Sequence, residues 1–269
     1  MDVLNKLLSI NPNYVLVGLI VVFFSMEMAV IRPIDFRGKL KHLFHSFLFQ
    51  VIAILMGSLL GFMVISTFEF IAEYKVGLFN WITVPYAFKI IAGFFLIDFA
   101  DYWFHRFDHK IPVLWRFHRV HHSDTSMDAS TAIRTYPTEL IYFTIGELII
   151  AVLFGLDIVS MNIFLLLLLP VQFIQHTSIE YPSWVDRMFG WLLMMPNYHK
   201  VHHEQDQFYT DSNYGTLFII WDRFFGTYRI KPVEEINYGL REFEGDRKQS
   251  FWYLIKSPFI SIRRITGDK

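Results

Sequence analysis

Long apolar stretches are the feature that most limits how this chain can fold. Residues 42–68 contain no Asp, Glu, Lys or Arg. The hydrocarbon core of a bilayer is about 30 Å thick, so a helix needs about 20 mostly apolar residues to cross it. Residues 42–68 are therefore predicted to form a membrane-spanning helix. Within them, Gly57 and Gly61 form a Gly-xxx-Gly pair, which predicts that another helix packs closely there.

Two further spans are predicted on either side of this segment. The stretch Tyr14–Ile31 is apolar except for Glu27 near its end. The stretch Trp81–Phe104 is long enough, although Lys89, Asp98 and Asp101 interrupt it. Both are therefore candidate spans.

A helical hairpin is predicted after them. Residues 138–156 and 159–175 are both apolar, and a tight turn near Asp157 joins them. The hairpin either crosses the bilayer or only dips into it. A backbone that crosses the lipid has no water to bond with, so an apolar segment there satisfies its hydrogen bonds by forming a helix. We therefore predict an all-α fold, an integral membrane helical bundle of four or five spans with a cytoplasmic helical cap.

The composition agrees with a membrane protein. Apolar residues make up 54% of the chain and charged residues 18%, against about 45–50% and about 25% in soluble domains. The absence of Cys excludes disulfides, iron–sulfur clusters and thiolate metal ligands. The 24 basic and 25 acidic residues nearly cancel, so overall charge indicates no nucleic-acid partner.

The basic residues indicate how the bundle is oriented. With five spans, all 24 Lys and Arg residues except Lys6, Lys75 and Lys89 fall in segments on one face. The positive-inside rule makes that face cytoplasmic. We therefore predict a multi-pass integral membrane protein whose histidine motifs and C-terminus are cytoplasmic.

The chain divides into three predicted segments. Residues 1–80 are N-terminal membrane helices, and residues 81–230 form the domain that carries the histidine motifs. Residues 231–269 form a basic amphipathic cytoplasmic tail. Within the tail, residues 251–264 mix aromatic and basic side chains, which is typical of a segment along the headgroup surface.

Nine of the 11 histidines lie between residues 105 and 203, and eight of them form three motifs. One motif is HxxxH, and two are HxxHH. On a helix, side chains three and four residues apart lie on one face. Neutral imidazoles placed in this way can bind one metal ion or two neighbouring ions. The predicted ligands are His105, His109, His118, His121, His122, His199, His202 and His203.

His176 is a ninth predicted ligand, although it lies outside the three motifs. A lone histidine at the end of a span is usually an interfacial residue. A hairpin that returns from the turn at Asp157 nevertheless brings residue 176 to the face that carries the second motif. That face lies about one bilayer thickness away from the turn. We therefore expect His176 to bind metal.

The number of histidines bears on the metal. Imidazole binds Zn, Cu, Fe and Ni, and a zinc site uses three or four protein ligands in a tetrahedron. Eight or nine histidines supply four or five ligands to each of two ions. This excess over tetrahedral demand favours a redox-active, higher-coordinate pair such as iron, while zinc remains chemically open.

Three carboxylates stand close to predicted ligands in the sequence. A carboxylate that accepts the second ring N–H of a bound imidazole fixes its tautomer and orientation. Asp101 precedes His105 by one helical turn, and Asp124 and Glu204 each follow a histidine pair. We predict this supporting role for all three, and the alternative for Asp101 is a solvated carboxylate at a helix end.

Other polar residues of the apolar segments receive different interpretations. His42 and His45 are not accompanied by a third histidine, so they are expected to be interfacial residues in the headgroup zone. Glu147 lies in a predicted span, where ionisable groups usually face a cavity or a partner. It either lines a substrate path or pairs with Lys89.

The histidine motifs and the residues around them resemble the membrane-bound fatty acid hydroxylase and sterol desaturase superfamily. Asp98 and Tyr102 precede the first motif, and the ending resembles that of bacterial members. The resemblance covers about residues 90–230. The other matching residues are Pro112, Leu114, Trp115, Ser123, Arg134, Pro137 and Glu139, the run Thr210–Gly215, and the run Trp221–Tyr228.

The resemblance implies a function. It indicates a helical membrane fold with two Fe ions in a non-haem di-iron centre, with O2 as co-substrate and a lipid C–H bond as the target. Two ferrous ions would bind and reduce O2, giving an oxidant that removes hydrogen and returns hydroxyl. Members also carry a separate histidine before the third motif, as His176 does here. No catalytic side chain is predicted beyond the metal centre.

Partners and alternatives follow from the same interpretation. The chain has no GxGxxG or CxxC run, so a separate electron-donor protein or reductase is expected to dock on the basic tail. The lipid substrate is expected to come from the bilayer. The same centre could instead desaturate, demethylate or decarbonylate its substrate. A non-catalytic metal transporter or sensor is the alternative from another class, but a transporter places its ligands near the bilayer midplane.

Overall fold

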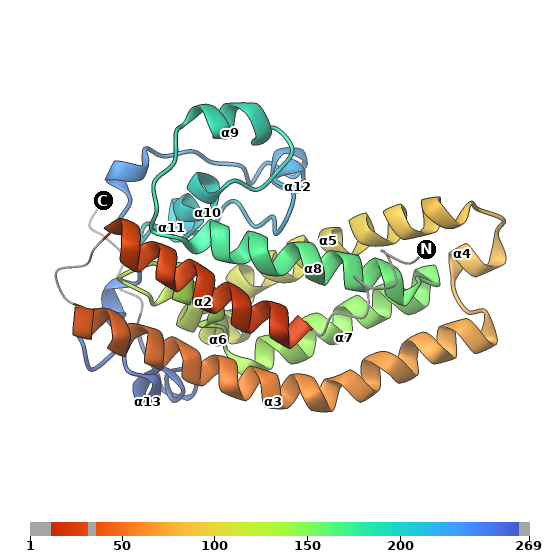
Figure 1. Ribbon diagram of the computed structural model, residues 1–269, viewed down its shortest axis with the longest axis horizontal. Coiled ribbons are helices and arrows are strands. Elements are labelled where there is room, and N and C mark those ends of the chain that lie inside the picture. Colours follow the sequence, from red (N-terminus) through yellow and green to blue (C-terminus); the bar gives the residue numbers. More distant parts are fainter. Residues whose placement is uncertain (1–11, 32–35, 264–269) are drawn as a thin grey trace.

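The computed structural model describes residues 12–31 and 36–263, and within these ranges it is helical with no strand. The long helices lie side by side, the short helix α4 lies at one end of them, and most of the other short helices lie toward the opposite end (Figure 1). The bounds are α2 Pro12–Ile31, α3 Phe36–Tyr74, α4 Leu78–Trp81, α5 Tyr86–Lys110, α6 Pro112–His122, η1 Ala129–Ile133, α7 Pro137–Phe154, α8 Ile158–His176, α9 Trp184–Phe189, α10 Pro196–His202, α11 Gln207–Thr210, α12 Ile220–Phe224, η2 Val233–Glu235, η3 Arg241–Phe243, α13 Phe251–Leu254 and η4 Ser257–Phe259.

Three of the described segments are long and apolar enough to cross a membrane. They are Phe36–Trp81, which contains α3, then α7 and α8. They include the segments predicted at 42–68, 138–156 and 159–175, and they make the protein membrane-associated. The apolar part of α2, Tyr14–Val30, is shorter than these three segments. Helix α5 contains too many charged residues to be counted among the candidate membrane spans.

The hairpin of α7 and α8 is closed by a glycine and an aspartate, as the turn near Asp157 predicts. Gly155 ends α7 with a φ of 65°, in the left-handed region that glycine adopts without strain. Asp157 begins α8, because its side chain accepts a hydrogen bond from the backbone N–H of Val159 at 2.9 Å. The two apolar helices are therefore antiparallel neighbours.

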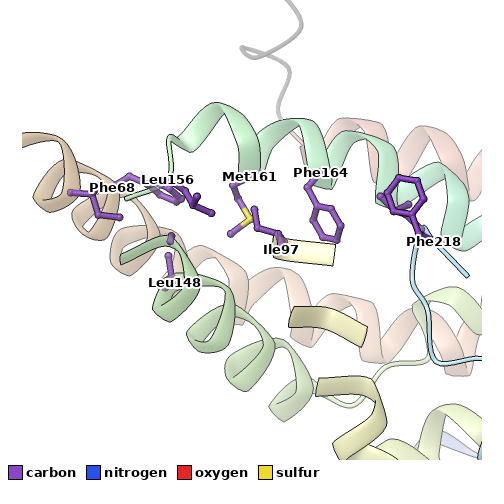
Figure 2. Packing of buried hydrophobic residues seen from close by; sticks show 10 residues of the cluster. Phe68, Ile97, Leu148, Leu156, Met161, Phe164 and Phe218 are labelled. Carbon is purple, nitrogen blue, oxygen red and sulfur yellow. The ribbon is translucent and has the colours of Figure 1, made fainter. Parts of the chain in front are cut away.

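The largest buried cluster joins the long helices to the short helices. Ile97 of α5, Leu148 of α7 and Phe164 of α8 pack together in it, as Figure 2 shows. Phe218, which follows α11 in the chain, lies against the same cluster. The segment after α11 is therefore packed directly onto the long helices.

The C-terminal segment folds back onto the bundle. Phe251 and Leu254 of α13 are buried with Phe49 of α3, and the rings of Phe49 and Phe251 are 4.9 Å apart. Trp252, between them, is exposed. This segment, predicted to follow the headgroup surface, therefore buries one face against protein.

Close helix packing occurs at a different glycine from the pair identified in the sequence. A Cβ at Gly61 would meet nothing within 4 Å, and one at Gly57 would meet only a Leu140 methyl at 3.9 Å. The prediction for Gly57 and Gly61 is therefore wrong. At Gly93 of α5, by contrast, a Cβ would lie 2.9 Å from the Cβ of Ser160 in α8.

We expect Gly93→Ala to destabilise the protein by about 1–3 kcal/mol, because the added methyl group overpacks the contact between α5 and α8. The measurement is the thermal unfolding midpoint in detergent. Gly61→Ala is the matched control, and it should leave the midpoint unchanged or raise it, since alanine favours a helix over glycine. Equal midpoints for the two variants would contradict the close approach at Gly93.

Candidate metal centre

Four helices bring the nine predicted histidines together at one end of the bundle. His105 and His109 lie on the last turns of α5, and His176 is the last residue of α8. Pro112 begins α6 two residues after α5 ends, so the chain turns there and carries the second motif back over the first. The second motif ends α6, and the third spans α10 and the residue after it.

The nine imidazoles form two clusters, in each of which one ring nitrogen per residue lies within 4.8 Å of the others. In the first, His118 Nε2 lies 3.2 Å from His105 Nε2 and 3.1 Å from His122 Nε2. In the second, His176 Nε2 lies 3.1 Å from His121 Nε2 and 3.0 Å from His199 Nε2. The five-histidine cluster is His105, His109, His118, His122 and His202, and the four-histidine cluster is His121, His176, His199 and His203.

The two HxxHH motifs divide their histidines between the clusters in opposite ways. In α6, the i,i+4 pair His118 and His122 enters the five-histidine cluster, and His121 enters the other. In the third motif, the i,i+4 pair His199 and His203 enters the four-histidine cluster, while His202 crosses to the first. One residue on a helix turns the side chain by about 100°, so each motif faces both clusters.

Backbone carbonyls fix the tautomer of three imidazoles. The Nδ1 atoms of His105, His176 and His202 lie 2.8, 2.7 and 2.6 Å from carbonyl oxygens, which only accept hydrogen bonds. These Nδ1 atoms therefore carry the proton, and the Nε2 lone pairs face the clusters. His202 Nε2 is buried and has no hydrogen-bond partner within the described ranges.

The loop between α11 and α12 supplies two of these carbonyls, those of Ser212 and Tyr214. Asn213, between them, has a φ of 50° and hydrogen-bonds the backbone of Tyr198 and Arg229. Asp222 accepts the backbone N–H of Tyr214 at 2.8 Å. The runs 210–215 and 221–228, noted in the sequence only for their resemblance, therefore orient the imidazoles.

Burial keeps most of these histidines neutral. Desolvation and the neighbouring imidazoles hold the pKa of His121, His122, His199 and His203 well below its usual range. Desolvation, followed by the charge of His118, lowers the pKa of His202 to about 3. Neutral imidazoles with converging lone pairs are the form in which histidine binds a metal. The two clusters therefore fit metal ions.

His118 has a carboxylate partner from another helix. Its Nδ1 lies 2.7 Å from Glu139 Oε2 and 3.8 Å from Asp108 Oδ2. Burial alone would lower the pKa of His118, but these two carboxylates outweigh it and raise that pKa. His109 Nδ1 lies 3.4 Å from Asp211 Oδ1. The carboxylates beside the imidazoles are therefore distant in the sequence, and residue spacing gives no signal for them.

The three carboxylates that were predicted for this role bind other groups. Asp124 Oδ1 lies 2.8 Å from His42 Nε2, and its Oδ2 accepts a hydrogen bond from Thr131. Glu204 pairs with Lys231 at 2.6 Å. The prediction for Asp124 and Glu204 is therefore wrong. Each carboxylate follows its histidine pair at a helix end and contacts another segment of the chain instead.

The prediction that Asp101 supports a ligand imidazole is also wrong, because its partner is Glu147. The two side chains are buried against each other between α5 and α7. Glu147 therefore does not pair with Lys89, whose ammonium donates to Asn80 Oδ1 at 2.8 Å.

His42 is largely buried against carboxylates, and its expected position in the headgroup zone stays a prediction. Its ring lies between the carboxylates of Asp124 and Asp128, at 2.8 and 3.2 Å, and its side chain is only 12% exposed. His45 and His42 both lie outside the two clusters.

Residues 90–227 match the sequence profile of a family described as "Fatty acid hydroxylase". Alkylglycerol monooxygenase from Xenopus tropicalis is 34% identical over 151 residues, which are 54% of this chain and 31% of that protein. The protein of that name from Danio rerio is 33% identical over 164 residues, 60% of this chain and 35% of its own length.

A bacterial relative is more distant. Ornithine lipid hydroxylase OlsE from Rhizobium tropici is 26% identical over 153 residues, 55% of this chain and 44% of that protein. The chain thus spans less than half the length of each of these relatives. No solved structure matches it.

We expect Glu139→Gln to weaken metal binding by the five-histidine cluster about 10- to 100-fold, because His118 loses the carboxylate that orients it. The amide oxygen still accepts the Tyr136 N–H that Glu139 Oε1 now accepts, so α7 keeps its first turn. The measurement is metal retention against a competing chelator. The control Glu204→Gln makes the same chemical change at a carboxylate paired with Lys231, and it should retain metal like the unsubstituted protein. Equal losses would contradict the role of Glu139.

Proposed function

The chain belongs to the fatty acid hydroxylase family, and we propose that it is a membrane-bound oxygenase that hydroxylates an alkyl C–H bond of a lipid at a di-iron centre. The observation that carries the proposal is the pair of buried histidine clusters. The reaction consumes the lipid, O2, two electrons and two protons, and it forms the lipid alcohol and water.

The residues of each cluster would hold one iron ion. Five nitrogens exceed the four that a tetrahedral zinc site uses. Ligands at right angles around an ion with bonds of about 2.1 Å lie about 3.0 Å apart, and tetrahedral ligands lie about 3.4 Å apart. Nε2 pairs that lie 3.0–3.2 Å apart are close enough for one ion to bind both atoms. When bound, the ions supply the reduction of O2 and the attack on carbon.

The protein's own part is to position the imidazole ligands and to exclude water from them. His105, His176 and His202 present fixed lone pairs, because backbone carbonyls hold the proton on the far nitrogen of each ring. All nine histidines lie at helix ends rather than in the middle of an apolar span, which favours an enzyme over a transporter. Electrons would come from a separate donor protein, since the chain has no Cys for an electron-carrying cluster.

Isotope labelling tests the activity. The iron-loaded protein with a reductase system and labelled O2 should place one labelled oxygen atom in a membrane lipid. The purified chain should hold two irons. His199→Ala and His202→Ala should each lose about one iron and nearly all turnover, because they open different clusters.

His45→Ala is the matched control, since His45 lies outside both clusters, and it should keep both irons and its turnover. A product that lacks two hydrogens would replace hydroxylation by desaturation. Full iron content in both cluster variants would overturn the ligand assignment.

We further propose that α2 and α5 also cross the bilayer, which gives five spans with the clusters and the C-terminus in the cytoplasm. The chain reverses direction after α3 and again between α7 and α8, so the far loops face the opposite side (Figure 1). The distribution of Lys and Arg supports this orientation.

Single-cysteine labelling tests the orientation, because the chain has no native Cys. Thr83→Cys is in the loop before α5 and Asp246→Cys is in the C-terminal segment, and both positions are exposed. In intact cells, an impermeant maleimide should label position 83 and should reach position 246 only after permeabilisation. Labelling of both from outside would refute the five-span topology.

A further inference from the structure

A cavity of about 500 Å³ opens beside the five-histidine cluster. Its volume falls within the usual range of small-molecule sites, about 300–1,000 Å³. His109 and Trp115 lie in its wall, and their rings are 5.0 Å apart. The cavity therefore reaches one of the imidazoles that the proposed function assigns to iron.

The wall of the cavity is strongly basic. Lys110, Arg116 and Arg119 line it, and Glu242 is the one carboxylate among its lining residues in the described part of the chain. Arg116 and Arg119 lie three residues apart on α6, so they share a face. The cavity therefore carries more positive than negative charge.

The hydrogen bonds of the two arginines leave their charge in place. Arg116 donates to the carbonyl of Ile260 at 3.2 Å, and Arg119 donates to the carbonyl of Ser257 at 2.5 Å. A carbonyl satisfies an N–H group without neutralising the cation. Guanidinium groups of this kind form strong, often bidentate, bonds to phosphate.

Several exposed apolar side chains are neighbours in the chain of residues that line this basic cavity. Phe107, Ile111 and Val113 are exposed where α5 passes into α6, and Phe259 and Ile260 are exposed in the C-terminal segment opposite. Apolar side chains next in the chain to the residues of a cationic pocket, at the end of a membrane helix, match the boundary between acyl chains and headgroups. A lipid is therefore the ligand that fits both features.

Lys110 connects the cavity to the cluster. Its ammonium donates to Asp211 Oδ2 at 2.8 Å, and Asp211 Oδ1 lies 3.4 Å from His109 Nδ1. Lys110 is thus two contacts away from a cluster imidazole, and an anion bound to it would be three contacts away. A headgroup held here keeps the attached alkyl chain beside the five-histidine cluster.

We propose that this cavity binds the phosphate headgroup of the lipid substrate through Lys110, Arg116 and Arg119. The inference rests on the proposed lipid hydroxylation and specifies its substrate class as phosphate-bearing lipids. Three cations match the several oxygens of a phosphate better than a lone carboxylate. An acidic protein is the weaker fit, because protein docking uses surfaces of about 800 Å² per partner rather than a concave cavity.

Binding measurements on the full-length protein in detergent test this. The probes are radiolabelled palmitoyl lysophosphatidate, palmitoyl glycerol, which lacks the phosphate, and glycerol 3-phosphate, which lacks the chain. The lysophosphatidate should bind at least tenfold more tightly than either. Arg116→Gln and Lys110→Gln should each weaken its binding about tenfold and leave palmitoyl glycerol unaffected.

Arg247→Gln is the control, because it removes one exposed positive charge outside the cavity. Its affinity for all three probes should not change. Equal affinities for lysophosphatidate and palmitoyl glycerol would overturn the proposal, as would tight binding of glycerol 3-phosphate alone. Variants that bind lysophosphatidate normally but accept electrons more slowly from the reductase would assign the cavity to the electron donor instead.

The same samples separate this inference from the function on which it rests. Lysophosphatidate that binds through Arg116 but yields no oxygenated product, with every other lipid also unreacted, would refute the hydroxylase and keep the site. Oxygenation of palmitoyl glycerol at the same efficiency as lysophosphatidate would refute the phosphate specificity and keep the hydroxylase.

Discussion

The fold depends on the convergence of nine imidazole lone pairs inside the protein. A buried polar group without a partner costs about 1–3 kcal/mol, and here Nε2 atoms face one another at 3.0–3.2 Å. A cation bound by several of these atoms at once removes that penalty. Metal binding by these clusters would therefore be linked to the folding of this end of the molecule, as in other proteins whose site is built by folding.

The apolar helices serve this site by fixing where its histidines stand. Gly93 lets α5 approach α8 at Ser160, which sets the spacing between the helices that carry His109 and His176. A second constraint comes from Glu27, the buried acid in the apolar helix α2. Its carboxylate accepts hydrogen bonds from Ser178 N at 2.8 Å and from Thr177 Oγ1 at 3.0 Å. The charge in the first apolar helix therefore anchors the chain directly after His176.

The sequence predicted the parts of this structure that are encoded locally. The spacing of the histidines predicted a shared site, and the turn at Asp157 predicted the hairpin that brings His176 to it. Contacts between distant segments were not predictable in this way. Glu139 meets His118 from 21 residues away, and nothing in the residues around either one indicates that contact.

The same limit explains the errors. Asp124 and Glu204 follow histidines in the chain, but their side chains contact other segments. Asp124 contacts the imidazole of His42, and Glu204 contacts the ammonium of Lys231. Gly57 and Gly61 have the spacing of a packing motif, yet among the described residues no backbone atom of another helix would lie within 4 Å of a Cβ at either position. Spacing shows which residues share a face, whereas the partner of that face depends on the whole fold.

The opposite division of the two HxxHH motifs links the two clusters mechanically. Helix α6 gives two ligands to the first cluster and one to the second, and the third motif does the reverse. His122 and His203, which belong to different clusters, stack with ring centres 4.5 Å apart. A shift of α6 or α10 therefore changes both clusters at once, although α5 contributes only to the first cluster and α8 only to the second. If each cluster held one ion, the shared helices α6 and α10 would position the ligands of both ions together.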